Sequence, residues 1–123
     1  MVRAREVGWV SVLASEDRTR LVLAGELDEA VIRDLRAAVE AAARRALPTD
    51  IDARNVTFMD SSSVAALIRL AARLPERPRL IEPPELLRFL LEVTKLDEAM
   101  DVVEQDPGFE GEPLHPQPDV TPA

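Results

Sequence analysis

The alternation of apolar and polar residues predicts a β-hairpin near the start of the chain. Residues 10–13 and 20–24 form the two predicted strands, and the turn-like residues 16–19 connect them. The alternation breaks at residues 25–28, which we expect to form a loop. Asp28 belongs to the residue types that cap helix N-termini, so we expect a helix to begin there.

Apolar residues at spacings of three and four predict three helices after this hairpin. They cover residues 29–47, 62–74 and 85–92, and each has one apolar face. Two further strands, residues 49–53 and 79–82, alternate with the helices. A strand–helix–strand order favours parallel strands with right-handed crossovers, so the pattern predicts an α/β domain.

The remaining segments of this region are less regular. Residues 55–59 are expected to connect a strand to the second helix, and residues 99–104 form a last short strand or helix. Asp50 and Asp52 alternate with apolar residues, so we expect only one face of the strand at residues 49–53 to be covered.

Parallel pairing of the second and third predicted strands brings two polar loops together. Both strands then end at the same edge of the sheet, so residues 25–28 lie beside residues 60–63. Open α/β sheets place their binding sites at that edge. We therefore expect the functional site there.

The length of 123 residues predicts one domain with flexible ends. Residues 1–8 form a predicted N-terminal arm, residues 9–104 the domain, and residues 105–123 a tail. The tail holds five of the ten prolines and two of the four glycines. It has too little apolar surface to offset its ordering entropy, so we predict a disordered, Pro-rich acidic tail.

The composition excludes several classes of function. A net charge of −8 and an aromatic content of 3% speak against nucleic-acid binding. The chain has no Cys, and its one His, His115, lies in the tail, so neither a catalytic triad nor a Cys or His metal site is expected. We predict no cofactor, no metal and no enzymatic activity. Without an apolar leader or a long apolar run, we expect a cytoplasmic chain with no direct membrane insertion.

The most informative stretch is the acid and three serines at the start of the second helix. Asp60, Ser61, Ser62 and Ser63 follow an apolar strand directly. Free backbone N–H groups and the helix dipole favour a negative group at this position, so a phosphate on a serine could be held there. The alternative is an ordinary helix cap, although one cap needs only one such residue.

Two other features of this region admit alternative interpretations. Asp28 and Asp60 could form a Mg²⁺ ligand pair, an acidic patch that senses a phosphoserine, or two separate caps, and we favour the caps over a metal site. Phe58 and Met59 are expected to pack in the core. Residues 89–91 form either a buried helix face or a docking groove, and we favour the buried face.

Three segments of the chain resemble the STAS domain family, and in particular the bacterial anti-sigma factor antagonists. They are residues 21–28 (LVLAGELD), 56–62 (VTFMDSS) and 83–96 (PPELLRFLLEVTKL), in the order expected over residues 9–104. The resemblance implies a small mixed β-sheet of four to five strands packed with three to four helices.

The resemblance also implies a function and a site. A domain of this kind binds an anti-sigma factor that is a serine kinase, and so releases a sigma factor. Phosphorylation of the serine after the acid, here Ser61, breaks the complex, and a serine phosphatase restores it. The residues implied to bind the partner are Gly25, Glu26, Asp28, Asp60, Ser61, Ser62, Ser63 and Val64.

The chain departs from the family pattern at two places. Ser63 stands where the family usually has Gly, which makes Ser62 and Ser63 alternative phosphate acceptors. The final helix of the family is missing or replaced by the tail. The alternative function is a non-switching STAS scaffold subunit of an ABC lipid-transport or stress-signalling complex. A small serine hydrolase would need a base near Ser61 that the sequence does not supply.

Overall fold

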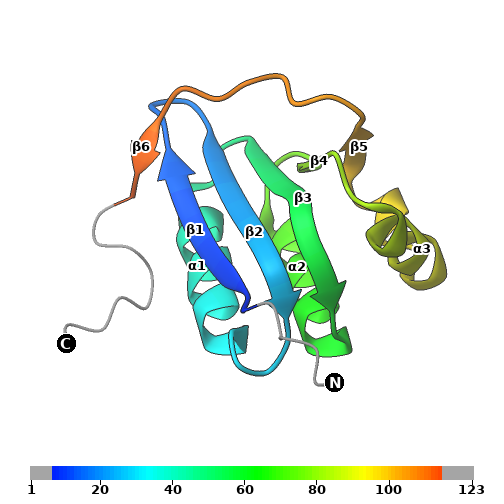
Figure 1. The fold of residues 1–123 in the computed structure, drawn as a ribbon. Helices are drawn as coiled ribbons and strands as arrows, with labels where there is room; N and C mark the ends of the chain where they lie inside the picture. The colour runs from blue at the N-terminus through cyan, green and yellow to red at the C-terminus, as the bar shows by residue number, and fades with distance from the viewer. Residues whose placement is uncertain (1–6, 115–123) are drawn as a thin grey trace.

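The computed structural model describes residues 7–114, which form a six-stranded mixed sheet with three α-helices and one short 3-10 helix (Figure 1). The order of the strands across the sheet is β5-β4-β3-β2-β1-β6. The elements in chain order are β1 (Trp9–Ala14), β2 (Thr19–Leu27), α1 (Ile32–Arg45), β3 (Thr49–Met59), α2 (Ser61–Arg73), β4 (Arg79–Ile81), α3 (Glu85–Thr94), η1 (Leu96–Glu98), β5 (Asp101–Val103) and β6 (Glu112–Pro113).

The pairing of the strands confirms the predicted topology. β1 and β2 form an antiparallel hairpin, and β2 with β3, β3 with β4, and β4 with β5 pair in parallel. The α/β class is therefore as predicted, with one strand more than expected within the described residues. The additional strand is β6, which the predicted disordered tail supplies.

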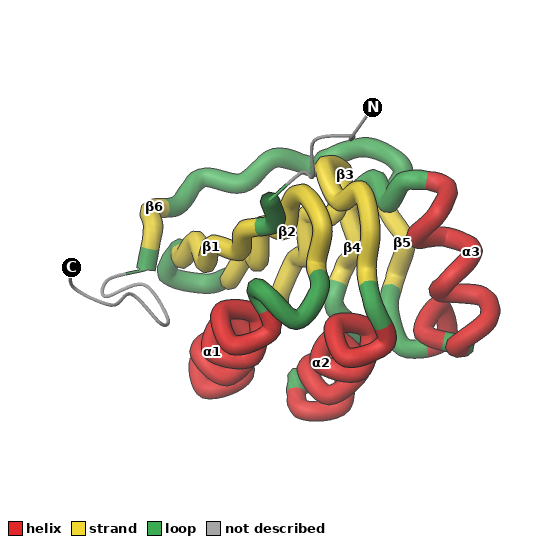
Figure 2. The backbone as a smooth tube through the Cα atoms, turned by 60° about the horizontal axis from the view of Figure 1, so that its bottom comes forward, coloured by secondary structure: helices red, strands yellow, loops and turns green. Residues whose placement is uncertain are grey.

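Helices α1 and α2 cover one face of the sheet, and α3 lies beyond it at the β4–β5 side (Figure 2). The core fills the space between these two helices and the sheet. Its largest fully buried side chains include Leu21, Leu23, Leu35, Ile51, Leu67 and Leu70. Among residues 7–114, no helix covers the opposite face of the sheet, which is called the open face below.

Strand β3 differs from the expectation of a short strand with one covered face. It runs from Thr49 to Met59, so the expected connector at residues 55–59 is part of the strand. Asp50 and Asp52 point to the open face and are nevertheless buried. Arginines from neighbouring strands contact both carboxylates, and one sequence segment read alone could not show this.

The prediction of a disordered tail is wrong for residues 105–114. We call residues 104–114 the strap, because this segment crosses the open face from β5 and pairs β6 with β1 (Figure 1). The rest of the predicted tail, with His115, lies outside the described residues, as do residues 1–6 of the predicted arm. Charge pairs and backbone hydrogen bonds hold the strap, so its low hydrophobicity did not prevent order.

Candidate functional site

The C-terminal end of β2 and the N-terminal end of α2 are joined by two hydrogen bonds to one carbonyl group. The backbone N–H of Asp60 and the hydroxyl of Ser63 both donate to the carbonyl oxygen of Leu27, each at 3.0 Å. The two predicted loops therefore lie side by side, as parallel pairing requires. The joint fixes the position of the serines relative to β2.

Asp60 caps helix α2. Its carboxylate accepts a hydrogen bond from the backbone N–H of Ser63 at 2.9 Å. The helix begins at Ser61, and both Ser61 and Ser62 are exposed in its first turn. The cap fixes the start of the helix, and the side chains of Ser61 and Ser62 are accessible to solvent there.

Ser63 does not fit the role of an alternative phosphate acceptor. Its exposed fraction is 0%, and its hydroxyl donates to Leu27. A residue with a Cβ is thus accommodated where the related family usually has Gly, because the hydroxyl finds a buried acceptor. Val64 is also buried and packs in the core. Both side chains are buried beneath the exposed serines, so neither is available on the surface for contact with a partner.

Gly25 is part of β2 and not of a loop. It is buried with φ +73°, and a Cβ at this position would lie 2.4 Å from the carbonyl oxygen of Val7. Its role in the fold is to let residues 7 and 8 approach the strand, and a partner contact through Gly25 stays a prediction. Glu26, the next residue, is half-buried within β2.

Asp28 shapes the turn before α1. Its side chain accepts a hydrogen bond from the backbone N–H of Ala30 at 3.0 Å, and its carbonyl accepts one from Val31 at 3.0 Å. The helix starts at Ile32, three residues later than expected, because this turn intervenes. The expectation of two caps therefore holds for Asp60 only, because the N-cap of α1 is Val31 and no side chain caps that helix. Within residues 7–114, no three Asp, Glu or His side chains gather as a metal ion would need.

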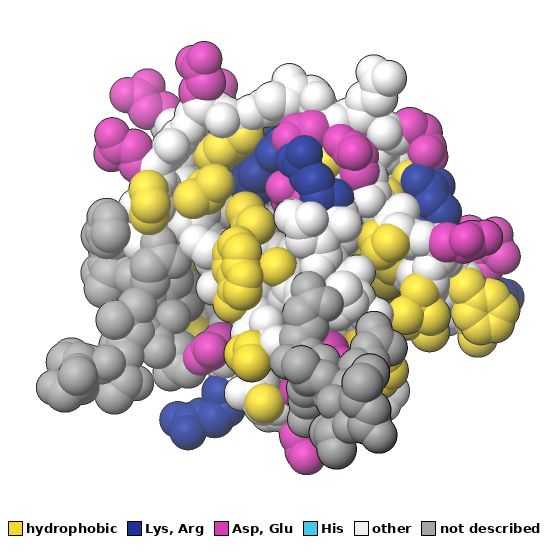
Figure 3. Space-filling model, in the orientation of Figure 1, with side chains coloured by type: hydrophobic (Ala, Val, Ile, Leu, Met, Phe, Trp, Pro, Cys, Tyr) yellow, Lys and Arg dark blue, Asp and Glu magenta, His cyan; other side chains and the backbone are white. Residues whose placement is uncertain are grey.

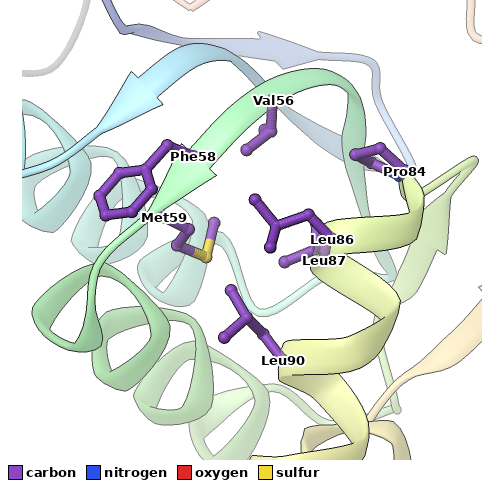
Figure 4. A pocket seen from close by; sticks show the side chains of 7 residues that line it. All are labelled: Val56, Phe58, Met59, Pro84, Leu86, Leu87 and Leu90. Atoms are coloured by element: carbon purple, nitrogen blue, oxygen red, sulfur yellow. The ribbon is translucent and has the colours of Figure 1, made fainter.

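An exposed apolar surface lies beside the serines, where a buried one was expected. We call Phe58, Leu86, Phe89 and Val93 the α3 patch, and their exposed fractions run from 46% to 64%. Figure 4 shows Val56 and Met59 of β3 on the side of Leu86, Leu87 and Leu90 of α3, whereas the ring of Phe58 points away from these leucines. Met59 is buried as predicted, whereas Phe58 and Phe89 are not.

The sequence contains a signal for the α3 patch. Leu86, Phe89 and Val93 follow one another at spacings of three and four, and Leu87 and Leu91 lie four residues apart on another side of the same helix. Only one set can face the sheet, and Leu87 and Leu91 are the buried pair. An apolar helix with two such stripes predicts that one stripe is exposed.

The sequence of residues 10–104 matches the family described as Mlab, STAS domain. This match covers well over half of the chain, so the chain belongs to the STAS domain family. No curated protein sequence matches the chain.

Solved structures of anti-sigma factor antagonists share the fold. An anti-sigma factor antagonist from Mycobacterium paratuberculosis has a TM-score of 0.69 and 19% identity, with 78% of this chain and 85% of that chain covered. The anti-sigma factor antagonist SpoIIAA in its unphosphorylated form has a TM-score of 0.66 and 22% identity, with 77% and 88% covered. The Bacillus cell fate determinant SpoIIAA in the phosphorylated form has a TM-score of 0.62 and 21% identity, with 77% and 91% covered.

Proposed function

We propose that the chain is an anti-sigma factor antagonist that binds an anti-sigma factor serine kinase and is switched off by phosphorylation of Ser61. The observation that carries this proposal is the exposed Ser61 hydroxyl at the capped N-terminus of α2. The STAS fold, shared with antagonists solved in unphosphorylated and phosphorylated forms, supports it. In this function the chain is a cytoplasmic binding module and not an enzyme, and a serine phosphatase resets it.

The electrostatics of the site suit such a switch. Phosphorylation adds a charge of about −1.5 to −2. The N-terminus of α2 stabilises this charge within the domain, so no refolding is needed. At a partner interface the phosphate adds its negative charge to those of Asp28 and Asp60 on the antagonist's side. A loss of about 1.4 kcal/mol of binding free energy already lowers the affinity tenfold. Burying a phosphate beside these carboxylates at an interface costs more binding free energy than that.

The α3 patch extends the proposed partner surface beyond the serines. Phe58 lies on the strand that leads into Asp60 and Ser61, so this residue of the patch is close to the serines along the chain. Among the described residues, the acidic side chains of Glu26, Asp60 and Glu85 are at least partly exposed near these elements. A partner with apolar side chains surrounded by basic ones fits this combination.

Phosphosite mapping tests the proposal. The full chain is incubated with a cognate anti-sigma kinase and ATP, and the product is analysed by intact-mass spectrometry and peptide mapping. We expect one phosphate, on Ser61, and none on the Ser61→Ala variant. The Ser62→Ala variant is the matched control, because it removes an equally exposed hydroxyl and should still be modified. Modification at Ser62, or none with any cognate kinase, would contradict the proposal.

Binding measurements separate the switch from the alternative scaffold function. The α3 patch is an exposed apolar surface that does not include Ser61, and this favours a partner that binds independently of phosphorylation. Such a scaffold subunit of an ABC lipid-transport or stress-signalling complex would bind equally well as wild type and as Ser61→Asp. A switched antagonist would lose at least about tenfold in affinity with Ser61→Asp and keep it with Ser61→Ala.

A further inference from the structure

The open face of the sheet carries a group of charged side chains that the proposed function does not use. Figure 3 looks onto this face and shows Lys and Arg side chains gathered near its upper end, with acidic side chains beside them. Within residues 7–114, the charge pairs there join Arg18, Arg20, Arg54 and Arg79 to Asp50, Asp52, Glu82 and Asp106. Of the four carboxylates, only that of Asp106 comes from the strap.

Asp106 occupies the position of a bound anion between two arginines. Its carboxylate oxygens accept hydrogen bonds from Arg20 Nη2 at 2.9 Å and Arg20 Nη1 at 3.1 Å, and also from Arg54 Nη2. Arg20 is only 4% exposed, and its Nε has no hydrogen-bond partner within the described residues. A buried guanidinium without its bidentate partner would attract another carboxylate strongly.

The strap also places an aromatic side chain against Arg20, close to the carboxylate of Asp106. Three residues after Asp106, the ring of Phe109 lies 5.3 Å from the guanidinium carbon of Arg20, within cation–π range. The backbone N–H of Gly108 donates to the Asp106 carboxylate at 2.8 Å, and Gly108 has φ +89°, so a tight turn joins the two side chains. The face therefore fits an acid and an aromatic residue three positions apart.

The end of the strap covers the edge of β1 with few contacts. Leu13 pairs with Pro113 and Ala14 with Glu112, and the backbone N–H of Leu114 donates to the carbonyl of Val12 at 2.9 Å. An uncovered edge strand offers the same backbone groups to any other extended segment.

The strap buries less of its surface than the residues beneath it. None of the residues 104–114 is buried, whereas Arg20 and Asp50 under them are. Segments with little buried apolar surface open at a low free energy while the rest of the domain stays folded. The strap can thus leave the surface without unfolding the sheet.

We propose that the surface made by Arg20, Arg54 and the edge of β1 is a peptide-binding site, and that the strap is its intramolecular occupant. The partner that fits it is an extended acidic segment of another protein. That segment carries a carboxylate, an aromatic side chain three residues later, and backbone that pairs with β1. Arg20 lies near the start of β2, whereas the hydrogen bonds to α2 are made by Leu27 at the end of the strand. The peptide-binding site is therefore separate from the serines and independent of the proposed function.

Competition with a free strap peptide tests the site. A fluorescein-labelled peptide of residues 104–114 is titrated with the full chain and with the full-length double variant Asp106→Asn/Phe109→Ala, and its anisotropy is followed. The attached strap competes at a high effective concentration in wild type. We expect the double variant to bind the peptide at least about tenfold more tightly than wild type. Adding Arg54→Ala to the double variant should reverse most of this gain.

Two controls make the titration specific. The Glu110→Gln variant changes an exposed acid of the same strap and should bind the peptide no better than wild type. A peptide with Asn and Ala in place of Asp106 and Phe109 should bind neither form. Equal binding of the peptide to wild type and to the folded double variant would overturn the proposal.

Hydrogen exchange of the wild-type chain gives a second test, which also decides the matter if the double variant does not fold. The backbone N–H groups of Asp106, Gly108 and Leu114 should exchange at least about tenfold faster than those of β2, and faster still in high salt. If these strap amides exchange only when the whole domain unfolds, the strap is a permanent part of the fold and the proposal is wrong.

Discussion

At the scale of single residues, Ser63 shows how one hydroxyl determines the geometry of the site. Its side chain is buried and donates to Leu27, which also accepts the backbone N–H of Asp60. The neighbouring Ser61 and Ser62 have the same chemistry but face solvent. Three consecutive serines thus divide into one structural residue and two accessible ones.

This division predicts unequal effects of alanine substitutions on stability. Ser63→Ala should lower the free energy of unfolding by about 1 kcal/mol, because a buried hydrogen bond is lost. Ser62→Ala should change it by no more than about 0.5 kcal/mol. Urea denaturation followed by circular dichroism measures both values. Equal values for the two variants would show that the Ser63 hydroxyl has no structural role.

Asp50 is the second residue whose environment decides its importance. It is fully buried, and its carboxylate accepts hydrogen bonds from Arg18, Arg20 and Arg79 at distances of 2.7 to 3.1 Å. Burial alone would raise the pKa of Asp50, but the hydrogen bonds from Arg79 and Arg20 outweigh it and hold the pKa below its usual value.

Removal of this carboxylate should be strongly destabilising. Asp50→Ala leaves the buried Arg20 without one of its partners, and a broken buried ion pair costs about 3–5 kcal/mol. The matched control is Glu40→Ala, because Glu40 also pairs with two arginines, Arg44 and Arg73, but on the exposed surface. Thermal unfolding should show a far larger loss for Asp50→Ala than for the control. Similar losses would contradict the importance of burial here.

At the scale of elements, α3 has one buried and one exposed apolar face. Leu87 and Leu91 pack in the core, and Leu86, Phe89 and Val93 remain exposed. Within residues 7–114, no helix is both long and apolar enough to cross a membrane. Exposed apolar surface of this kind marks sites of protein contact.

The two faces of α3 predict opposite outcomes for neighbouring substitutions. Phe89→Ser should leave the free energy of unfolding within about 0.5 kcal/mol of wild type and weaken binding to the partner kinase. Leu91→Ala should cost about 2–5 kcal/mol of stability, because it opens a cavity in the core. Denaturant unfolding and calorimetric titration with the partner separate the two effects. Unchanged partner binding by Phe89→Ser would exclude the α3 patch from the interface.

At the scale of the whole molecule, the chain is acidic, yet arginines organise one face of it. The net charge of −8 coexists with the ion pairs of the open face, which join β2, β3, β4 and the strap. Hydrogen bonds from Arg20 hold the pKa of Asp106 far below its usual value, against the opposing effect of burial. Both Asp50 and Asp106 are therefore better ionised in the folded chain than in the unfolded one.

The depressed pKa values predict loss of stability in acid. A carboxylate whose pKa is lowered on folding stabilises the fold fully above the unfolded pKa, about 3.9, and this contribution disappears as the pH falls toward the folded pKa. The free energy of unfolding should be nearly constant above about pH 5 and fall steadily below pH 4. Denaturant titrations at a series of pH values measure the slope, and Asp106→Asn should make it shallower. An identical slope in that variant would show that protonation of Asp106 does not contribute to the loss of stability in acid.

Local patterns in the sequence determined most of the elements, and with them the segments that meet at the candidate site. The spacing of apolar residues located the hairpin, the three helices and the parallel order, since these depend on neighbours only a few residues apart. A cap at the start of α2 also followed from local rules. The contact between the ends of β2 and α2 followed from the expected parallel pairing of β2 and β3.

Only the tertiary structure decided which face of α3 is buried, which serine is accessible and whether the strap is ordered. Phe89 and Leu91 are equally apolar, and only the position of the sheet separates them. Asp106 is bound by Arg20 and Arg54, which lie far from it along the chain. Electrostatic pairs over such separations leave no periodic signal in the sequence, because they depend on where the completed fold brings each charge.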